Sequence, residues 1–210
     1  MKDLRRRSVT ALVYGAVVLA SLFAPPVVFD VLLAVLGTIA IVELFGLRRA
    51  GPPVLIESLL LGMGLASLRY LRSLGDPSEP LFLVLLATWA NDVAGYTIGS
   101  AFGRRKITPT LSPGKTWEGT LAGFAAAAVT VLLVDAVSNS SHPWVPLLAA
   151  TLGPVAFAGD LLESWIKRRA GAKDSGTLFP GHGGVLDRID SILATALLAT
   201  TVIVVTGRMG

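Results

Sequence analysis

The sequence contains no cysteine, and this absence excludes disulfide bonds, thiol catalysis and thiolate metal sites. It also has few charges: only 15% of its 210 residues are Asp, Glu, Lys or Arg, against a hydrophobic fraction of 53%. Histidine occurs only twice, which disfavours metals that prefer imidazole ligands. This composition, with a mean hydropathy of +0.69, is typical of a chain whose surroundings are largely lipid.

Long apolar runs recur along the whole chain, and a membrane-spanning helix needs about 20 apolar residues. We predict an all-α, polytopic integral membrane helical bundle of about seven transmembrane helices, with six as the main alternative. The runs are too long for strands and do not alternate with a period of two. The predicted spans cover residues 9–24, 27–47, 54–68, 81–102, 120–137, 144–166 and 189–206.

The apolar runs leave no room for a separate soluble region, so we expect one membrane domain over residues 1–210. The first run is followed by further runs and by no small-residue cleavage site, so we expect a retained anchor rather than a signal peptide. The third run is short and contains Glu57, which makes it the least secure span.

The chain has a formal net charge of +4, and its Lys and Arg residues are unevenly distributed between the two sides of the predicted bundle. With seven spans, 15 of the 18 Lys and Arg residues fall on one side, which the positive-inside rule places in the cytoplasm. Positive charges that flank a bilayer favour binding of anionic lipids or phosphorylated substrates. We therefore expect no nucleic-acid partner. The 15 residues are Lys2, Arg5, Arg6, Arg7, Arg48, Arg49, Arg104, Arg105, Lys106, Lys115, Lys167, Arg168, Arg169, Lys173 and Arg188.

A polar stripe ends the sixth run, just before the only long polar passage, residues 164–190. Asp160, Glu163, Ser164 and Lys167 follow helical spacing and therefore share one face. Ionisable groups at membrane depth cost roughly 2.5 to 3.5 kcal/mol each, so they persist mainly when paired, hydrated or bound to metal. The structural alternative is an ion-paired stripe that only orients the helix.

Two further acids, Asp187 and Asp190, begin the seventh span. They resemble a helix cap, but they also complete a set of four carboxylates within 31 residues at the ends of two consecutive helices. Hard oxygen ligands of this kind suit Mg²⁺, which takes one or two carboxylates together with substrate phosphates. We predict a Mg²⁺ site formed by Asp160, Asp187 and Asp190, with Asp92 nearby. Whether a second, monovalent cation also binds is left open.

Cationic and glycine residues of the polar passage suit phosphate oxygens. Gly183 and Gly184 flank His182 and expose backbone N–H groups to an anion. The bases Lys167, Arg168, Lys173 and Arg188 join them as predicted phosphate contacts, although topogenic charge or a lipid-headgroup patch would explain the same residues.

Two upstream features add polar groups. Ser112 and Lys115 lie in a basic loop that reads either as a phosphate site or as the start of a helix. Asn91 and Asp92 lie in the middle of the fourth run, where a polar site is the favoured explanation. Glycines spaced by four residues, at Gly95, Gly99 and Gly103 and again at Gly119 and Gly123, favour close helix packing.

At these residues the sequence resembles the phosphatidate cytidylyltransferase (CDP-diacylglycerol synthase) family of membrane enzymes. The likeness covers residues 81–210, whereas residues 1–80 match only in being hydrophobic. It includes the Asn91 and Asp92 pair and the loop of residues 112–119. Every specified place of the family's C-terminal signature is filled, by Ser164, Ile166, Lys167, Arg168, Lys173, Asp174, Gly176, Phe179, Pro180, His182, Gly183, Gly184, Val185, Asp187, Arg188, Ile189 and Asp190.

The resemblance implies transfer of CMP from CTP to phosphatidic acid in a prokaryotic inner or plasma membrane, with Asp160, Lys173, Asp187 and Asp190 as catalytic residues. A homodimer is one way to complete the lipid-side cavity, because the chain has fewer N-terminal helices than many bacterial members. Two alternatives remain: a CTP-dependent kinase of a polyprenol or phytol, and an ion or proton transporter that uses the buried acids.

Overall fold

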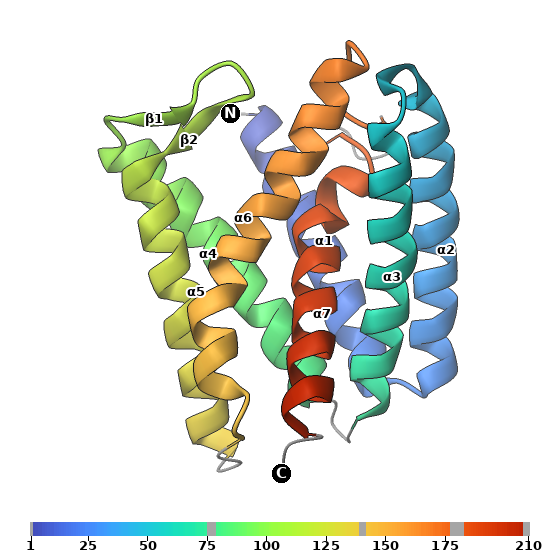
Figure 1. Ribbon diagram of the computed structural model, residues 1–210, viewed down its shortest axis with the longest axis vertical. Coiled ribbons are helices and arrows are strands. Elements are labelled where there is room, and N and C mark those ends of the chain that lie inside the picture. Colours follow the sequence, from blue (N-terminus) through green and yellow to red (C-terminus); the bar gives the residue numbers. More distant parts are fainter. Residues whose placement is uncertain (1, 75–78, 139–141, 177–182, 208–210) are drawn as a thin grey trace.

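The computed structural model is a bundle of long helices with one short hairpin (Figure 1). It describes residues 2–74, 79–138, 142–176 and 183–207, with side chains from residue 13 onward. The predicted all-α bundle is confirmed. Its elements are α1 (Lys2–Phe23), α2 (Pro26–Gly46), the 3₁₀ helix η1 (Arg48–Ala50), α3 (Pro53–Ser73), α4 (Glu79–Phe102), β1 (Lys106–Thr108), β2 (Ser112–Thr116), α5 (Trp117–Ser138), α6 (Val145–Arg169) and α7 (Leu186–Gly207).

Within the described residues, six helices, α2 to α7, are long and apolar enough to cross a bilayer. The helix α1 contributes a shorter apolar stretch, Val13–Phe23. The third run, the least secure prediction, forms a helix of 21 residues that extends beyond the predicted 54–68. Proline at the first turn starts α2 and α3 cleanly, because this position needs no backbone N–H donor.

The basic segments gather at one end of the bundle, which we call the site end. Figure 1 shows the start of α1, the hairpin, the α2–α3 turn and the α6–α7 connection at its upper end, and the C-terminus at the lower end. The predicted grouping of the basic segments on one side is therefore confirmed. That this side faces the cytoplasm stays a prediction.

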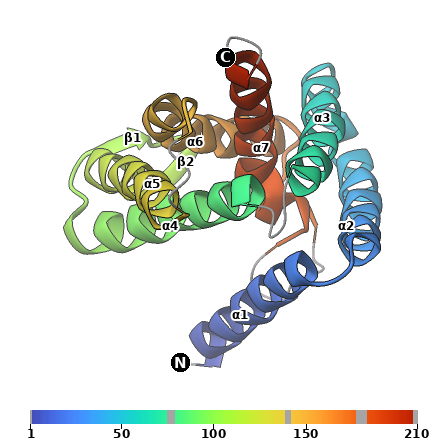
Figure 2. The ribbon, with the colours of Figure 1, turned by 90° about the horizontal axis from the view of Figure 1, so that it is seen from below.

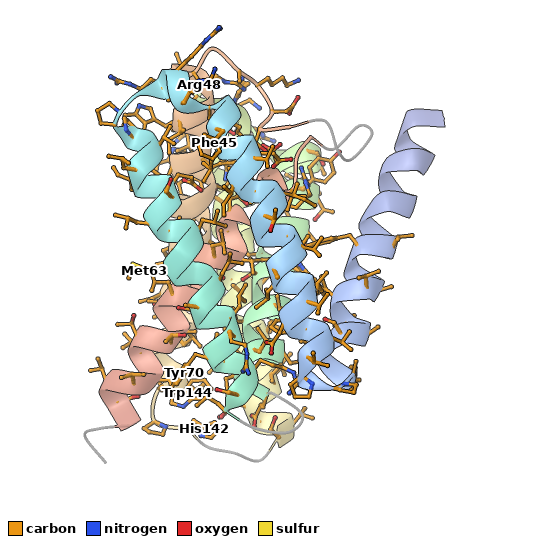
Figure 3. All side chains as sticks on the ribbon, turned by 90° about the vertical axis from the view of Figure 1, so that its right-hand side faces the viewer. Phe45, Arg48, Met63, Tyr70, His142 and Trp144 are labelled. Carbon is orange, nitrogen blue, oxygen red and sulfur yellow. The ribbon has the colours of Figure 1, made fainter. Side chains whose placement is uncertain are left out.

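Helix α7 forms the centre of the bundle. Seen along the helices, it lies between α3, α4 and α6, while α1 stands at the edge beside α2 (Figure 2). Large apolar side chains such as Phe45 and Met63 project from the outer face of α2 and α3, where they suit lipid (Figure 3). The core is correspondingly formed by the inward faces of the helices.

The hairpin differs from one of the two interpretations that the sequence left open for this loop, a helix start at Ser112. Residues 112–116 instead form β2, which pairs antiparallel with β1. Helix α5 begins only at Trp117, and the Thr116 hydroxyl accepts the Gly119 N–H at 3.2 Å. A threonine cap of this kind fixes where the strand stops and the helix starts.

Candidate active site

A cavity of about 680 Å³ lies between α4, α5, α6, α7 and the hairpin. Its wall combines carboxylates, cationic side chains and glycines, so it offers groups for both a cation and an anion. Eight of the residues predicted from the sequence line it: Asn91, Asp92, Ser112, Lys115, Asp160, Asp187, Arg188 and Asp190.

Three acids converge beside this cavity. Asp160 and Glu163 of α6 and Asp190 of α7 each offer one carboxylate oxygen, and these atoms all lie within 4.8 Å of one another. Glu163 and Asp190 are only 1% and 6% exposed. The Glu163 Oε1 atom is buried and has no hydrogen-bond partner among the described residues. A buried orphan oxygen within a carboxylate cluster fits a hard divalent cation.

Lys167 is held between two carboxylates. Its Nζ donates to Glu163 Oε2 at 2.6 Å and to Asp187 Oδ1 at 2.5 Å. The predicted polar stripe on α6 is present, since the Lys167–Glu163 contact and the 3.4 Å bond from Ser164 to Asp160 both join residues four apart. Lys167 itself is buried and lies outside the cavity lining, so its predicted phosphate contact is replaced here by two ion pairs.

Asp187 differs from the other predicted metal ligands. Its Oδ1 accepts from Lys167, and its Oδ2 accepts the Gly184 N–H at 2.6 Å, the Ser175 N–H at 3.0 Å and the Ser175 hydroxyl at 3.0 Å. The structure brings Asp187 to the cavity wall but leaves it out of the three-acid cluster. Donors from the protein bond to both of its oxygens in this structure.

Lys115 reaches from β2 into the site. Its ammonium forms an ion pair with Asp160 Oδ2 and lies 4.5 Å from the centre of the Phe157 ring. On α4, which also lines the cavity, the Asn91 amide donates to Asp92 Oδ1 at 3.1 Å. The hairpin therefore carries a cation directly to the acidic cluster, and α4 adds an acid beside it.

The glycines of α4 and α5 serve both packing and the cavity. A Cβ at Gly119 would lie 2.7 Å from the Gly99 Cα, so the two helices approach too closely for any side chain there. Gly95, Gly99 and Gly123 also line the cavity. Close packing, the favoured interpretation of their spacing, agrees with this contact.

Several predicted phosphate contacts lie away from the cavity. Arg168 and Lys173 are exposed and are not among the described residues that line it. Gly183 has a φ of +83°, which a side chain would strain, and Gly184 follows it at the start of α7. His182 lies outside the described residues.

The sequence places Glu163 in the polar stripe and among the four carboxylates, but it was not chosen as a predicted metal ligand. Its spacing of three residues from Asp160 was the available signal, because that spacing places both acids on one face. A second missed residue is Glu43 in α2, whose signal was an acid within an apolar run.

The fold and the site define a class: a helical membrane-protein bundle whose cavity has a carboxylate cluster suited to a divalent cation, beside cationic and glycine residues suited to phosphate oxygens. A sequence comparison specifies the family. The model of the Cytidylyltransferase family matches residues 53–206, and the chain belongs to this family. The matched range begins at α3, so α1 and α2 lie outside it.

Curated relatives carry the name phosphatidate cytidylyltransferase. The protein of Brucella suis biovar 1 is 46% identical over 143 residues, which cover 65% of this chain and 52% of the relative. That of Haemophilus influenzae is 43% identical over 141 residues, covering 62% and 49%. That of Mycobacterium leprae is 39% identical over 129 residues, covering 61% and 41%. The chain thus spans about half the length of the curated relatives it matches.

Proposed function

We propose that this protein transfers CMP from CTP to phosphatidic acid, forming CDP-diacylglycerol and pyrophosphate. The observation that carries the proposal is the three-acid cluster beside a cavity whose wall also holds Lys115 and Arg188. Family membership and the printed names of the relatives support it further, and they favour nucleotidyl transfer over the lipid-kinase and transporter alternatives.

The reaction needs no covalent nucleophile from the protein. A phosphate oxygen of phosphatidic acid forms a bond to the α-phosphorus of CTP, and the bond from that phosphorus to the β-phosphate oxygen breaks. Pyrophosphate leaves with the electron pair. Because both reactants are anions, the barrier is largely electrostatic, and cations held in position lower it.

The three acids suit Mg²⁺ for two reasons. One Glu163 oxygen has no hydrogen-bond partner among the described residues, and oxygens of Asp160 and Asp190 lie close to Glu163. We infer that these three residues hold the ion, with Asp92 on the adjoining wall. When bound, Mg²⁺ supplies Lewis-acid stabilisation of phosphate charge. Asp187 holds Lys167 and the start of α7 in place instead of ligating. A further monovalent cation stays a prediction.

The cationic residues would bind the substrate phosphates. Lys115 and Ser112 on the hairpin would hold the triphosphate, and Arg188 at the start of α7 would hold an oxygen of either substrate. Asn91 would orient Asp92 through its amide. The roles of Arg168, Lys173, His182, Gly183 and Gly184 as phosphate contacts stay predictions.

The site end would face the cytoplasm, where CTP is available. Since the chain has no cysteine, single cysteines introduced at Arg49 and Pro143 provide a clean test of orientation. A membrane-impermeant maleimide added to intact cells should label Pro143→Cys and spare Arg49→Cys. The reverse pattern contradicts the orientation. A homodimer stays a prediction that cross-linking in the membrane would test.

The direct test incubates the purified protein with phosphatidic acid, Mg²⁺ and CTP labelled at the α-phosphate. We expect label in the lipid product and one pyrophosphate released per labelled lipid. CDP together with a lipid monophosphate would identify the kinase, and no turnover of CTP would contradict both enzymes. Asp190→Asn serves as the inactive control.

A further inference from the structure

A carboxylate from α2, outside the range that the family model matches, reaches the loop that leads into α7. Glu43 is only 8% exposed. Its Oε1 accepts the Val185 N–H at 3.0 Å, and its Oε2 accepts the Leu186 N–H at 2.8 Å. The Ser175 hydroxyl also donates to Oε2, at 3.2 Å.

These contacts cap α7 from a distant part of the chain. The first N–H groups of a helix have no partner within the helix, and Val185, immediately before α7, has no side-chain acceptor. Glu43 supplies the missing acceptor from more than 140 residues away in sequence. Its negative charge also suits the positive end of the helix dipole.

Two glycines of the loop are explained by the same carboxylate. A Cβ at Gly176 would lie 2.8 Å from the Glu43 carboxyl carbon. A Cβ at Gly184 would lie 2.5 Å from each Glu43 oxygen. A side chain at either glycine would have to push the Glu43 carboxylate aside, so the two glycines allow the backbone to close on it.

Glu43 is connected to the acidic cluster through hydrogen bonds. The single proton of the Ser175 hydroxyl is shared between Glu43 Oε2, at 3.2 Å, and Asp187 Oδ2, at 3.0 Å. Asp187 accepts from Lys167, and Lys167 donates to Glu163 of the cluster. The carboxylate of α2 therefore sits at the outer end of a chain of charged contacts that leads to the proposed metal ligands.

We propose that Glu43 is a positioning residue: it fixes the start of α7, and with it Arg188 and Asp190, against α6. Its effect on turnover rests on the function proposed above, whereas its effect on the helix start does not. Glu43 touches neither substrate in this account, so its loss should lower kcat and leave the apparent KM for CTP nearly unchanged.

The test compares Glu43→Gln with Asp30→Asn, which removes a carboxylate near the other end of the same helix. Hydrogen exchange is measured on peptides that cover residues 183–190, in detergent micelles. Because the Leu186 N–H relies on Glu43, we expect about 10- to 100-fold faster exchange in Glu43→Gln only. We expect kcat to fall by about 10- to 100-fold in the same variant.

Each outcome decides the proposal. Unchanged exchange and unchanged kcat in Glu43→Gln overturn it. A lower unfolding temperature with wild-type kcat per folded molecule also overturns it, because Glu43 would then only stabilise the fold. If the wild-type protein transfers no CMP, the proposed function fails, yet the exchange measurement still supports or overturns the contact with α7.

Discussion

The two ends of the bundle use charge differently. At the site end, Glu163, Lys167 and Glu43 are buried, and the Asp187 side chain is 5% exposed. Lys167 joins Glu163 and Asp187 by bonds of 2.6 and 2.5 Å. Each of these four groups forms at least one hydrogen bond or ion pair. The arrangement fixes side chains that would otherwise be costly to keep away from water.

At the opposite end, the charges are fewer and, apart from the buried Arg72, more open. Arg69 and Asp30 pair at 2.5 Å, but their side chains are 48% and 39% exposed. His142 stacks on Trp144 with a ring separation of 4.6 Å, and Figure 3 shows both at this end of the bundle, where Tyr70 of α3 also lies. These groups suit a membrane boundary, where aromatic and charged residues anchor helices.

The comparison teaches that burial together with connection, and not the presence of charge, distinguishes a site from a boundary. Substitutions at the two ends should therefore differ in size and in kind. Site-end substitutions should change catalysis, whereas those at the opposite end should leave it almost unchanged.

The largest effect should come from removing one carboxylate of the cluster. Asp160→Asn or Asp190→Asn deletes a proposed ligand while keeping the side-chain shape, so kcat should fall by about 10²- to 10³-fold or more. Pyrophosphate release by purified, folded protein measures this. Wild-type turnover in both variants contradicts the assignment.

Lys167→Met should be the most destabilising change. It leaves Glu163 and Asp187 buried without their shared cation, which costs about 3 to 5 kcal/mol when a buried pair is broken. Thermal unfolding in detergent should show a clear drop. The matched control is Lys173→Met, since Lys173 is exposed and its loss should leave the unfolding temperature unchanged.

Lys115→Ala should weaken CTP binding without unfolding the protein. Losing a charge-assisted contact of about 1.5 to 3 kcal/mol should raise the apparent KM for CTP by about 10- to 100-fold. Lys115→Arg keeps the charge and should lie between Lys115→Ala and the wild type. An unchanged KM for CTP in Lys115→Ala would remove the hairpin from the proposed triphosphate site.

Ser164→Ala should have a small effect although it lies at the site end. Its hydroxyl donates to Asp160 over 3.4 Å, a long bond, and the proposed reaction needs no hydroxyl nucleophile. Turnover should stay within about threefold of wild type. Complete loss of activity in this variant would instead indicate a covalent intermediate.

The smallest effect should follow Asp30→Asn at the opposite end. An exposed ion pair contributes about 0 to 1 kcal/mol, so the unfolding temperature and turnover should both remain close to wild type. A loss of activity comparable to that of Asp190→Asn would contradict the distinction between the two ends.

Much of the fold follows from the sequence because local rules determine it. Apolar runs and prolines predict the helices, and the charge bias predicts which segments share an end. The helical spacing of Asp160, Glu163 and Lys167 predicts their common face, and their bonds agree with it. The hairpin was not predictable in this way, since residues 112–116 include proline and glycine and show no alternation.

The composition of the acidic cluster required tertiary structure. Asp187 and Asp190 are equally plausible ligands by spacing, and only the packing of α6 and the loop against α7 directs Asp190 to the cluster and Asp187 to Lys167. Glu43 is still harder to foresee, because its partners lie 132 to 143 residues away. A single sequence contains no local signal for such a contact.

The most direct test of the account is a titration with Mn²⁺, a paramagnetic substitute for Mg²⁺, followed by electron paramagnetic resonance of the purified protein. We expect Mn²⁺ to bind the wild type and the Asp187→Asn variant. The Asp190→Asn and Glu163→Gln variants should bind Mn²⁺ much more weakly. Equal Mn²⁺ binding in the wild type, Asp190→Asn and Glu163→Gln would contradict the claim that the three acids form the metal site.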